Sequence, residues 1–184
     1  MRDYIHTLAF GIYPYVAIAI FLLGSLLRFE REQYSWKSGS SQLLRARQLR
    51  IGSNLFHIGI LFLLFGHTVG LLTPHFVYAP FITAAQKQML AIRAGGVAGA
   101  MCFCGLTMLL HRRLYDERIR ATSSTADIAI LMLLWLQLVL GLISIPYSLG
   151  HRDGHMMMQL SHWAQHVVTF QFDAANGWGT ATPA

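Results

Sequence analysis

Four long apolar runs without a charged side chain limit the folds open to this 184-residue chain. They are residues 8–27, 51–72, 94–110 and 128–147. A helix of about 20 apolar residues spans the hydrocarbon core of a bilayer, and it satisfies its own backbone hydrogen bonds there. Three runs reach that length, and the third, at about 17 residues, lies near the lower limit. The sequence therefore predicts an all-α membrane protein with four transmembrane helices.

The composition agrees with a membrane protein. Hydrophobic residues make up 54% of the chain and charged residues only 12%, whereas soluble domains carry about 25% charged residues. The first run is too long for a signal-peptide core and lacks a small-residue cleavage site, so it is expected to stay as a helix. Cys102 and Cys104 lie inside an apolar run and are interpreted as small apolar helix residues.

The basic residues divide unequally between the two sides of the membrane. Ten lie in the two loops that follow the first and third runs: Arg28, Arg31, Lys37, Arg45, Arg47, Arg50, Arg112, Arg113, Arg118 and Arg120. Only Arg2, Lys87, Arg93 and Arg152 fall on the other side. Because cytoplasmic loops carry the excess of Lys and Arg, the N-terminus is predicted to lie outside. This topology explains the net charge of +6 without nucleic acid, and a further role in docking a cytoplasmic partner stays open.

Local signals predict how the helices begin and meet. Pro14 lies near the outer end of the first helix, where water can replace the lost backbone bond. Gly95 and Gly99 have the spacing that lets a neighbouring helix approach closely. Either Thr125 or Asp127 is expected to cap the fourth helix.

Three further segments connect or follow the four runs. The outer loop 71–96 is expected to contain a short surface helix before the third transmembrane helix, and 156–170, MMMQLSHWAQHVVTF, predicts a helix in the outer interface. Residues 173–184 lack apolar periodicity and are interpreted as a disordered or aberrant tail. The chain is thus interpreted as one transmembrane domain, 1–172, with a short tail.

Two histidines in the second run are its most informative polar residues. His57 and His67 lie about 15 Å apart along a helix axis and within about 80° around it, one in each leaflet. An ionisable side chain at this depth is a functional hypothesis by default. The pair is too far apart to share one metal ion but suits two stacked hemes, whose iron takes axial imidazole. Gly59 and Gly66 would leave room for a flat macrocycle. Neutral histidines bonded to a neighbouring helix, or a proton relay, remain alternatives.

Four blocks of the sequence resemble one known family, the gamma subunit of respiratory nitrate reductase, a diheme cytochrome b membrane anchor. The resemblance covers roughly residues 8–172. The blocks are IYPYVAIAIFLLGSLLRFEREQYSWKSGSSQLLR, SNLFHIGILFLLFGHTVGLLTPH, RRLYDERIRATSSTADI and WAQHVVTF.

The resemblance implies an electron-transfer subunit of the bacterial inner membrane. Such a subunit oxidises quinol near the outer face and passes electrons through two b hemes to a cytoplasmic iron–sulfur beta subunit and a molybdenum-cofactor alpha subunit. It implies that His57 is an axial iron ligand of the cytoplasm-proximal heme and His67 of the distal heme. Gly66 and Lys87 match positions of the quinol site. Lys87, expected in the outer loop, could donate to a quinone oxygen, and a solvated interfacial lysine is the alternative.

The family also has a fifth transmembrane helix that carries the two opposing heme ligands. With four runs, the chain is expected to lack this helix, which puts heme occupancy in doubt. The remaining histidines are expected to be poor substitutes because they lie near or beyond the helix ends: His6, His75, His111, His151, His155, His162 and His166. The basic loops could also bind heme propionates.

Two other functions can be weighed against electron transfer. A truncated, heme-deficient anchor or scaffold, in contact with membrane lipid and partner subunits, is the main alternative. A proton or ion carrier would need buried carboxylates, and none of the eight Asp and Glu residues lies in an apolar run. The sequence therefore disfavours an ion carrier.

Overall fold

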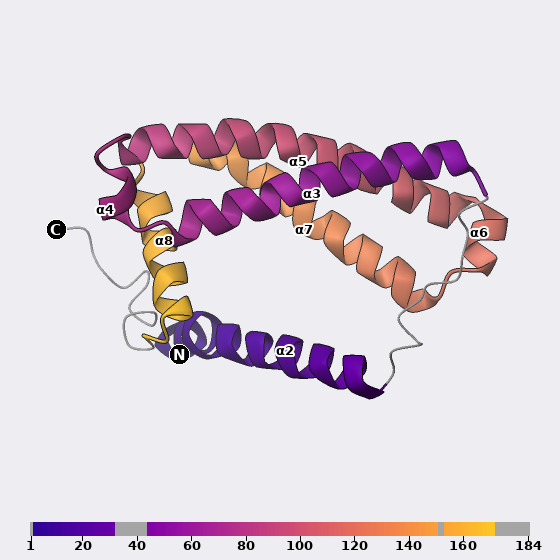
Figure 1. Cartoon of the computed structure of the whole chain (residues 1–184), viewed down its shortest axis with the longest axis horizontal. Coiled ribbons are helices and arrows are strands. Elements are labelled where there is room, and N and C mark those ends of the chain that lie inside the picture. Colours follow the sequence, from indigo (N-terminus) through magenta and orange to yellow (C-terminus); the bar gives the residue numbers. More distant parts are fainter. Residues whose placement is uncertain (1, 32–43, 151–152, 172–184) are drawn as a thin grey trace. The chain divides into compact units, whose positions relative to one another are not determined.

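The computed structural model describes residues 2–31, 44–150 and 153–171, and these residues form helices and loops without a strand (Figure 1). The prediction of an all-α membrane protein is confirmed. Four helices are long and apolar enough to cross a membrane: Tyr4–Arg31, Ala46–Leu72, Ala84–Tyr115 and Thr125–Gly150. The predicted tail 173–184 and His151 lie outside the described residues.

Nine helical elements follow one another along the described part of the chain. They are α1 (Arg2–His6), the π-helical η1 (Thr7–Ile12), α2 (Tyr13–Arg31), α3 (Ala46–Leu72), α4 (His75–Tyr78), α5 (Ala84–Tyr115), α6 (Glu117–Ala121), α7 (Thr125–Gly150) and α8 (His155–Val168). The chain divides into two compact units. Of the described residues, 2–31, 70–84 and 154–171 belong to the first unit, and 44–69, 85–150 and 153 belong to the second.

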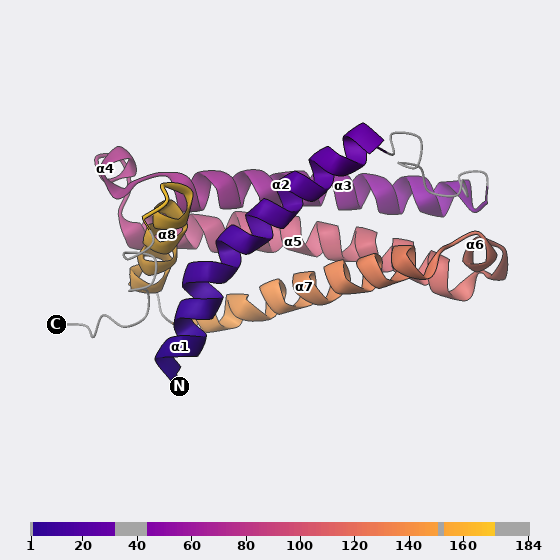
Figure 2. The same cartoon turned by 90° about the horizontal axis from the view of Figure 1, so that it is seen from below.

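Small residues bring α3 and α5 together in the second unit. The two helices lie side by side in both views (Figure 1, Figure 2). A Cβ atom at Gly59 would lie 2.7 Å from the backbone nitrogen of Cys102, and one at Gly105 would collide with the backbone of Phe56. Cys102 and Leu106 are almost completely buried along this seam. Such close backbone contact lets dispersion forces hold membrane helices together.

Polar side chains and Gly99 join α5 to α7. The indole Nε1 of Trp135 donates to Thr107 Oγ1 at 3.0 Å, and Gln88 Nε2 donates to the carbonyl of Ser148 at 3.1 Å. A Cβ at Gly99 would lie 2.9 Å from Leu142, whereas Gly95 has no neighbour within 4 Å. The predicted close approach is therefore confirmed at Gly99 and wrong at Gly95.

In the first unit, α8 supplies a hydrogen bond that Pro14 cannot make. Pro14 has no N–H and cannot donate to the carbonyl of Phe10, four residues earlier. The indole Nε1 of Trp163 donates to that carbonyl at 3.0 Å, and the Phe10 and Trp163 rings meet edge to face at 6.1 Å. The Trp163 side chain thus donates to the Phe10 carbonyl, where a water molecule was expected to do so. From the same helix, Gln165 donates to the carbonyl of Leu71 at 3.0 Å.

The structure corrects the predicted start of the third transmembrane helix. It begins at Ala84 and not at Ala94, so the expected surface helix and the transmembrane helix are one element of 32 residues. The stretch from Ala84 to Arg93 holds good helix formers and neither Pro nor Gly, so nothing interrupts it. Lys87 consequently lies in a helix and not in a loop.

The cap of α7 also differs from the prediction. Ser124, not Thr125 or Asp127, precedes the helix and caps it. The Asp127 backbone N–H donates to Ser124 Oγ at 3.1 Å, and the Ser124 N–H donates to Asp127 Oδ2 at 3.1 Å. This reciprocal pair is a capping box, in which the side chains of the cap residue and of the third helical residue each accept from the other's backbone N–H.

Candidate functional site

The backbone of α3 fixes the orientation of both predicted histidine ligands. The Nδ1 atom of His57 lies 2.7 Å from the carbonyl oxygen of Ser53, and the Nδ1 atom of His67 lies 2.7 Å from the carbonyl of Leu63. A carbonyl oxygen can only accept, so each Nδ1 carries the proton and donates it. Each Nε2 therefore keeps the lone pair that a metal ion requires.

This arrangement fits axial ligation of heme iron. A metal-ligating histidine usually donates its other ring N–H to a carbonyl or carboxylate, which fixes the tautomer and the ring orientation. Both side chains are exposed on this chain, so each imidazole can be reached from outside α3. An imidazole exposed in a membrane helix is expected to face a protein interior or cofactor, because contact with lipid is costly.

The environments of the two histidines differ in one polar contact. Ser53 Oγ lies 3.1 Å from His57 Nδ1, in addition to the contact from the Ser53 carbonyl. The residue four positions before His67 is Leu63, which offers a carbonyl and no hydroxyl. The spacing of the two histidines does not predict a contact between Ser53 and His57. The signal that the sequence offered for this contact is the serine four residues before a histidine in a membrane helix.

The two glycines beside the histidines have different surroundings. Gly59 is buried against Ala98 and Cys102 of α5 and serves helix packing, so the expectation that it leaves room for a macrocycle is wrong. Sequence spacing alone could not show which face of α3 meets α5. Gly66 is exposed, and a Cβ there would have no atom within 4 Å other than the adjoining residues and backbone of α3 itself. Gly66 therefore stays compatible with a neighbouring ligand.

Lys87 is buried in the first turn of α5. It is only 9% exposed, and Gln88 beside it is 5% exposed. This burial weighs against the alternative of a solvated interfacial lysine, since ammonium groups are rarely buried without a specific interaction. The predicted quinol-site residues therefore come from two helices, with Lys87 on α5 and Gly66 on α3.

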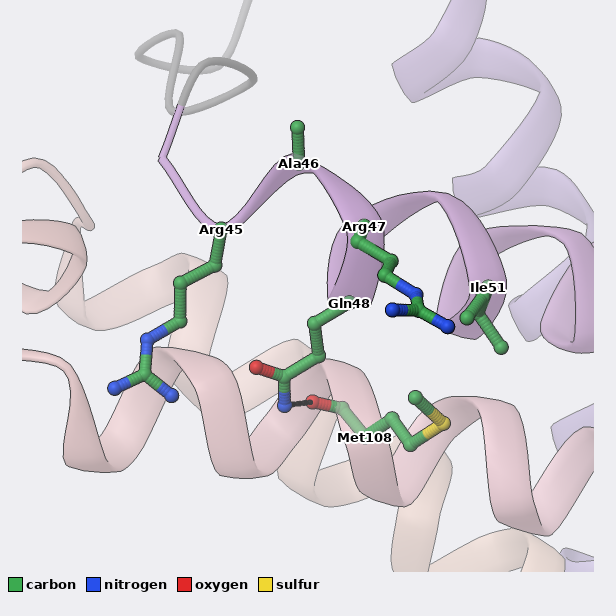
Figure 3. A pocket seen from close by; sticks show the side chains of 6 residues that line it. All are labelled: Arg45, Ala46, Arg47, Gln48, Ile51 and Met108. Carbon is green, nitrogen blue, oxygen red and sulfur yellow. Dashed lines mark hydrogen bonds between the residues drawn. The ribbon is translucent and has the colours of Figure 1, made fainter.

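One pocket lies away from the predicted site residues. It is an open depression of about 600 Å³ where α3 begins, lined by Arg45, Ala46, Arg47, Gln48, Ile51 and Met108 (Figure 3). Gln48 directs its amide to the carbonyl of Met108 at 3.3 Å, and the two arginines extend on either side of it. A smaller depression of about 440 Å³ on α5 borders Gln86 and Arg93. Neither of these two pockets is lined by a predicted site residue.

Several of the other described histidines make ring contacts near helix ends. His6 packs on Phe10 at 4.9 Å, His75 on Tyr78 at 5.1 Å and His111 on Tyr115 at 4.7 Å between ring centroids. His162 and His166 lie 6.5 Å apart on α8. Within the described residues, no three His, Cys, Asp or Glu side chains gather around a common metal position.

Comparisons with known proteins match nearly the whole chain. The family profile described as nitrate reductase gamma subunit matches residues 6–179. The chain is 48% identical to the respiratory nitrate reductase 1 gamma chain of Escherichia coli (strain K12) over 173 residues, which is 94% of this chain and 77% of that protein. It is 37% identical to the nitrate reductase gamma chain of Bacillus subtilis (strain 168) over 166 residues, 90% of this chain and 74% of that protein.

Proposed function

Because the chain belongs to the nitrate reductase gamma subunit family, we propose that it is the diheme cytochrome b of a respiratory nitrate reductase. It is a multi-pass membrane subunit of an oxidoreductase complex. In the proposed role it takes electrons from quinol at the outer face and passes them toward the cytoplasm. The observation that carries this proposal is the pair of imidazoles on α3, each anchored through Nδ1 to a backbone carbonyl at 2.7 Å.

Two b-type hemes, when bound, supply the one-electron carriers that quinol oxidation needs. His57 and His67 would hold the heme iron atoms through Nε2, and the Nδ1 bond to the backbone keeps each imidazole in a fixed orientation. Their separation of about 15 Å along α3 assigns one ligand to each leaflet. In a bilayer, the apolar residues around both positions on α3 would exclude water, which would lower the local dielectric constant. The alternative, a heme-deficient anchor, leaves two exposed membrane histidines without a role.

Lys87 and Gly66 are the proposed quinol-site residues. A buried ammonium group can donate a hydrogen bond to a quinone oxygen, and Gly66 leaves space on α3 because a Cβ there would have no neighbour within 4 Å. Oxidation of quinol at the outer face releases its protons there while the electrons cross inward. Each charge separated in this way stores about 2.3 kcal/mol per 100 mV of membrane potential.

The proposed setting is the bacterial inner membrane with the N-terminus outside. Its support is the excess of basic residues in and beside the connections from α2 to α3 and from α5 to α7. The cytoplasmic partners are the iron–sulfur beta subunit and the molybdenum-cofactor alpha subunit. The open pocket with Arg45 and Arg47 lies at the end of α3 that would face them.

Electron flow through membranes containing the assembled enzyme tests this function. Anaerobic addition of a quinol should reduce the b-type absorbance, and nitrate should reoxidise it. His67→Ala should block reduction by quinol, because its heme lies on the quinol side. His57→Ala should leave quinol reduction of the remaining heme intact and abolish reoxidation by nitrate. Wild-type membranes whose b-type absorbance responds to neither reagent would contradict the proposal.

A further inference from the structure

The two histidines of α3 are held by the same backbone geometry but by different side chains. Position i−4 is Ser53 for His57 and Leu63 for His67. Only Ser53 adds a hydroxyl oxygen, 3.1 Å from the ring nitrogen. We propose that Ser53 is a positioning residue, whose hydroxyl lowers the reduction potential of the heme bound by His57. This inference rests on the proposed heme ligation.

Donor and acceptor accounting determines what the hydroxyl does. The Nδ1–H of His57 already donates to the Ser53 carbonyl at 2.7 Å. The imidazole nitrogen therefore cannot accept a proton from the serine, and the hydroxyl oxygen faces an N–H donor. Since a serine oxygen has two lone pairs, it acts as a second acceptor in a three-centre hydrogen bond. With the Ser53 hydroxyl as a second acceptor, the Nδ1–H of His57 is more strongly hydrogen-bonded than with the carbonyl alone.

A stronger acceptor at Nδ1–H changes the ligand at the other side of the ring. Partial withdrawal of the proton raises the basicity of Nε2 and the electron density that it donates to iron. Donation stabilises Fe(III) relative to Fe(II), so the one-electron reduction potential falls. The effect is larger inside a membrane bundle than in water, because a low dielectric constant strengthens hydrogen bonds.

The same helix provides two matched comparisons. Leu63 is the equivalent position for the other histidine, so a hydroxyl can be added there at the same spacing. Thr68 carries a hydroxyl directly beside His67, but this group donates to the Leu64 carbonyl at 2.8 Å. Removal of the Thr68 hydroxyl therefore changes the polarity near a heme ligand without changing the bond to the imidazole.

Redox titration of the b-type absorbance in the assembled membrane enzyme tests the proposal. Ser53→Ala should raise the potential of the heme bound by His57, by up to about tenfold in the reduction equilibrium or about 59 mV. Leu63→Ser should lower the potential of the other heme, and Thr68→Val should shift neither. Ala suits a helix better than Ser, so folding is expected to be preserved. Unchanged potentials in Ser53→Ala, or equal shifts of both hemes, would overturn the inference.

A heme-independent measurement separates this inference from the proposed function. In the full chain labelled with ¹⁵N-histidine and kept free of heme, Ser53→Ala should move the His57 Nδ1–H resonance toward a weaker hydrogen bond. The resonances should still report the Nδ1–H tautomer, since the carbonyl remains. A preparation that never binds heme would end the proposed function. An unmoved His57 resonance would end the role of Ser53 on its own.

Discussion

The imidazoles of His57 and His67 are each tied to α3 by one nitrogen and can serve a ligand with the other. Tautomer and orientation follow from a single contact, because a carbonyl oxygen accepts and cannot donate. Both residues were predictable from their spacing and depth in an apolar helix. The Ser53 contact was not, because rotamers at the i−4 position decide whether a hydroxyl meets the ring.

Lys87 provides the first prediction at this scale. Lys87→Met keeps most of the buried stem and removes the ammonium group, so a hydrogen bond to the quinone oxygen is lost. A charged hydrogen bond of this kind predicts a quinol KM raised by roughly 10- to 100-fold, with unchanged heme absorbance. Gln86→Ala, on the exposed side of the same turn, is the matched control and should leave KM unchanged. Steady-state kinetics with a soluble quinol analogue would refute the role if Lys87→Met matched wild type.

At the scale of the elements, the seam between α3 and α5 depends on glycine. Gly59→Ala places a methyl group against the backbone of α5, 2.7 Å from a nitrogen and 2.8 Å from the Ala98 carbonyl. The helices must separate, which is expected to cost about 1–3 kcal/mol. Gly141→Ala meets nothing within 4 Å and should be neutral or stabilise the helix by up to about 1 kcal/mol. Thermal unfolding in detergent measures both, and equal Tm values would contradict this account.

The contact between α8 and η1 gives a second prediction. Trp163→Phe keeps an aromatic ring beside Phe10 but removes the donor to its carbonyl. A lost side-chain hydrogen bond in a membrane protein costs about 0.6 kcal/mol on average, and amide exchange near the N-terminus should become faster. Adding Pro14→Ala should restore part of the protection, because an alanine has a backbone N–H that can donate to the same carbonyl. Exchange rates insensitive to both substitutions would show that the bond is unimportant.

The connection between α5 and α6 should respond to acid. Asp116 caps α6, accepting from the backbone N–H groups of Ile119 and Arg118, and pairs with Arg45 at 2.8 Å. The backbone bond from Ile119, followed by the charge of Arg45, lowers the pKa of this carboxyl, although partial desolvation opposes the shift. Because the folded pKa lies below the unfolded one, the stabilisation is complete at neutral pH and is lost as pH falls through the folded pKa.

The matched variants isolate that carboxylate. Asp116→Asn should lower Tm at neutral pH and make Tm less sensitive to acid, whereas Glu117→Gln, its exposed neighbour, should behave as wild type. Tm measured from pH 7 down to pH 3 checks this. An Asp116→Asn profile parallel to wild type throughout would be inconsistent with the shifted pKa.

The sequence predicts the presence of the long helices better than it predicts where they begin. The four transmembrane helices follow from apolar length, because lipid leaves backbone polar groups no other partners. The start of α5 was wrong since hydropathy marks the apolar stretch, while the helix continues through polar residues that form helices well. The cap at Ser124 was missed by one residue, and a cap depends on local geometry that sequence signals locate only approximately.

At the scale of the whole molecule, the orientation in the membrane is inferred from the placement of the basic residues, and the enzyme complex from family membership. The unequal distribution of Lys and Arg predicts orientation because insertion responds to charge in short loops. The family assigns the chain to a nitrate reductase complex. The proposed quinol substrate and partner subunits come from the resemblance, since no composition or periodicity encodes which redox enzyme receives the electrons.

The heme content of the purified enzyme tests the central claim most directly. A reduced-minus-oxidised spectrum should show two b-type hemes per chain in the wild type. His57→Ala and His67→Ala should each retain one heme, and the two retained hemes should have different potentials. His111→Ala, whose ring stacks on Tyr115, should retain both. A wild type without b-type absorbance, or histidine variants with unchanged spectra, would contradict the assignment of α3 as the helix that carries one ligand for each heme.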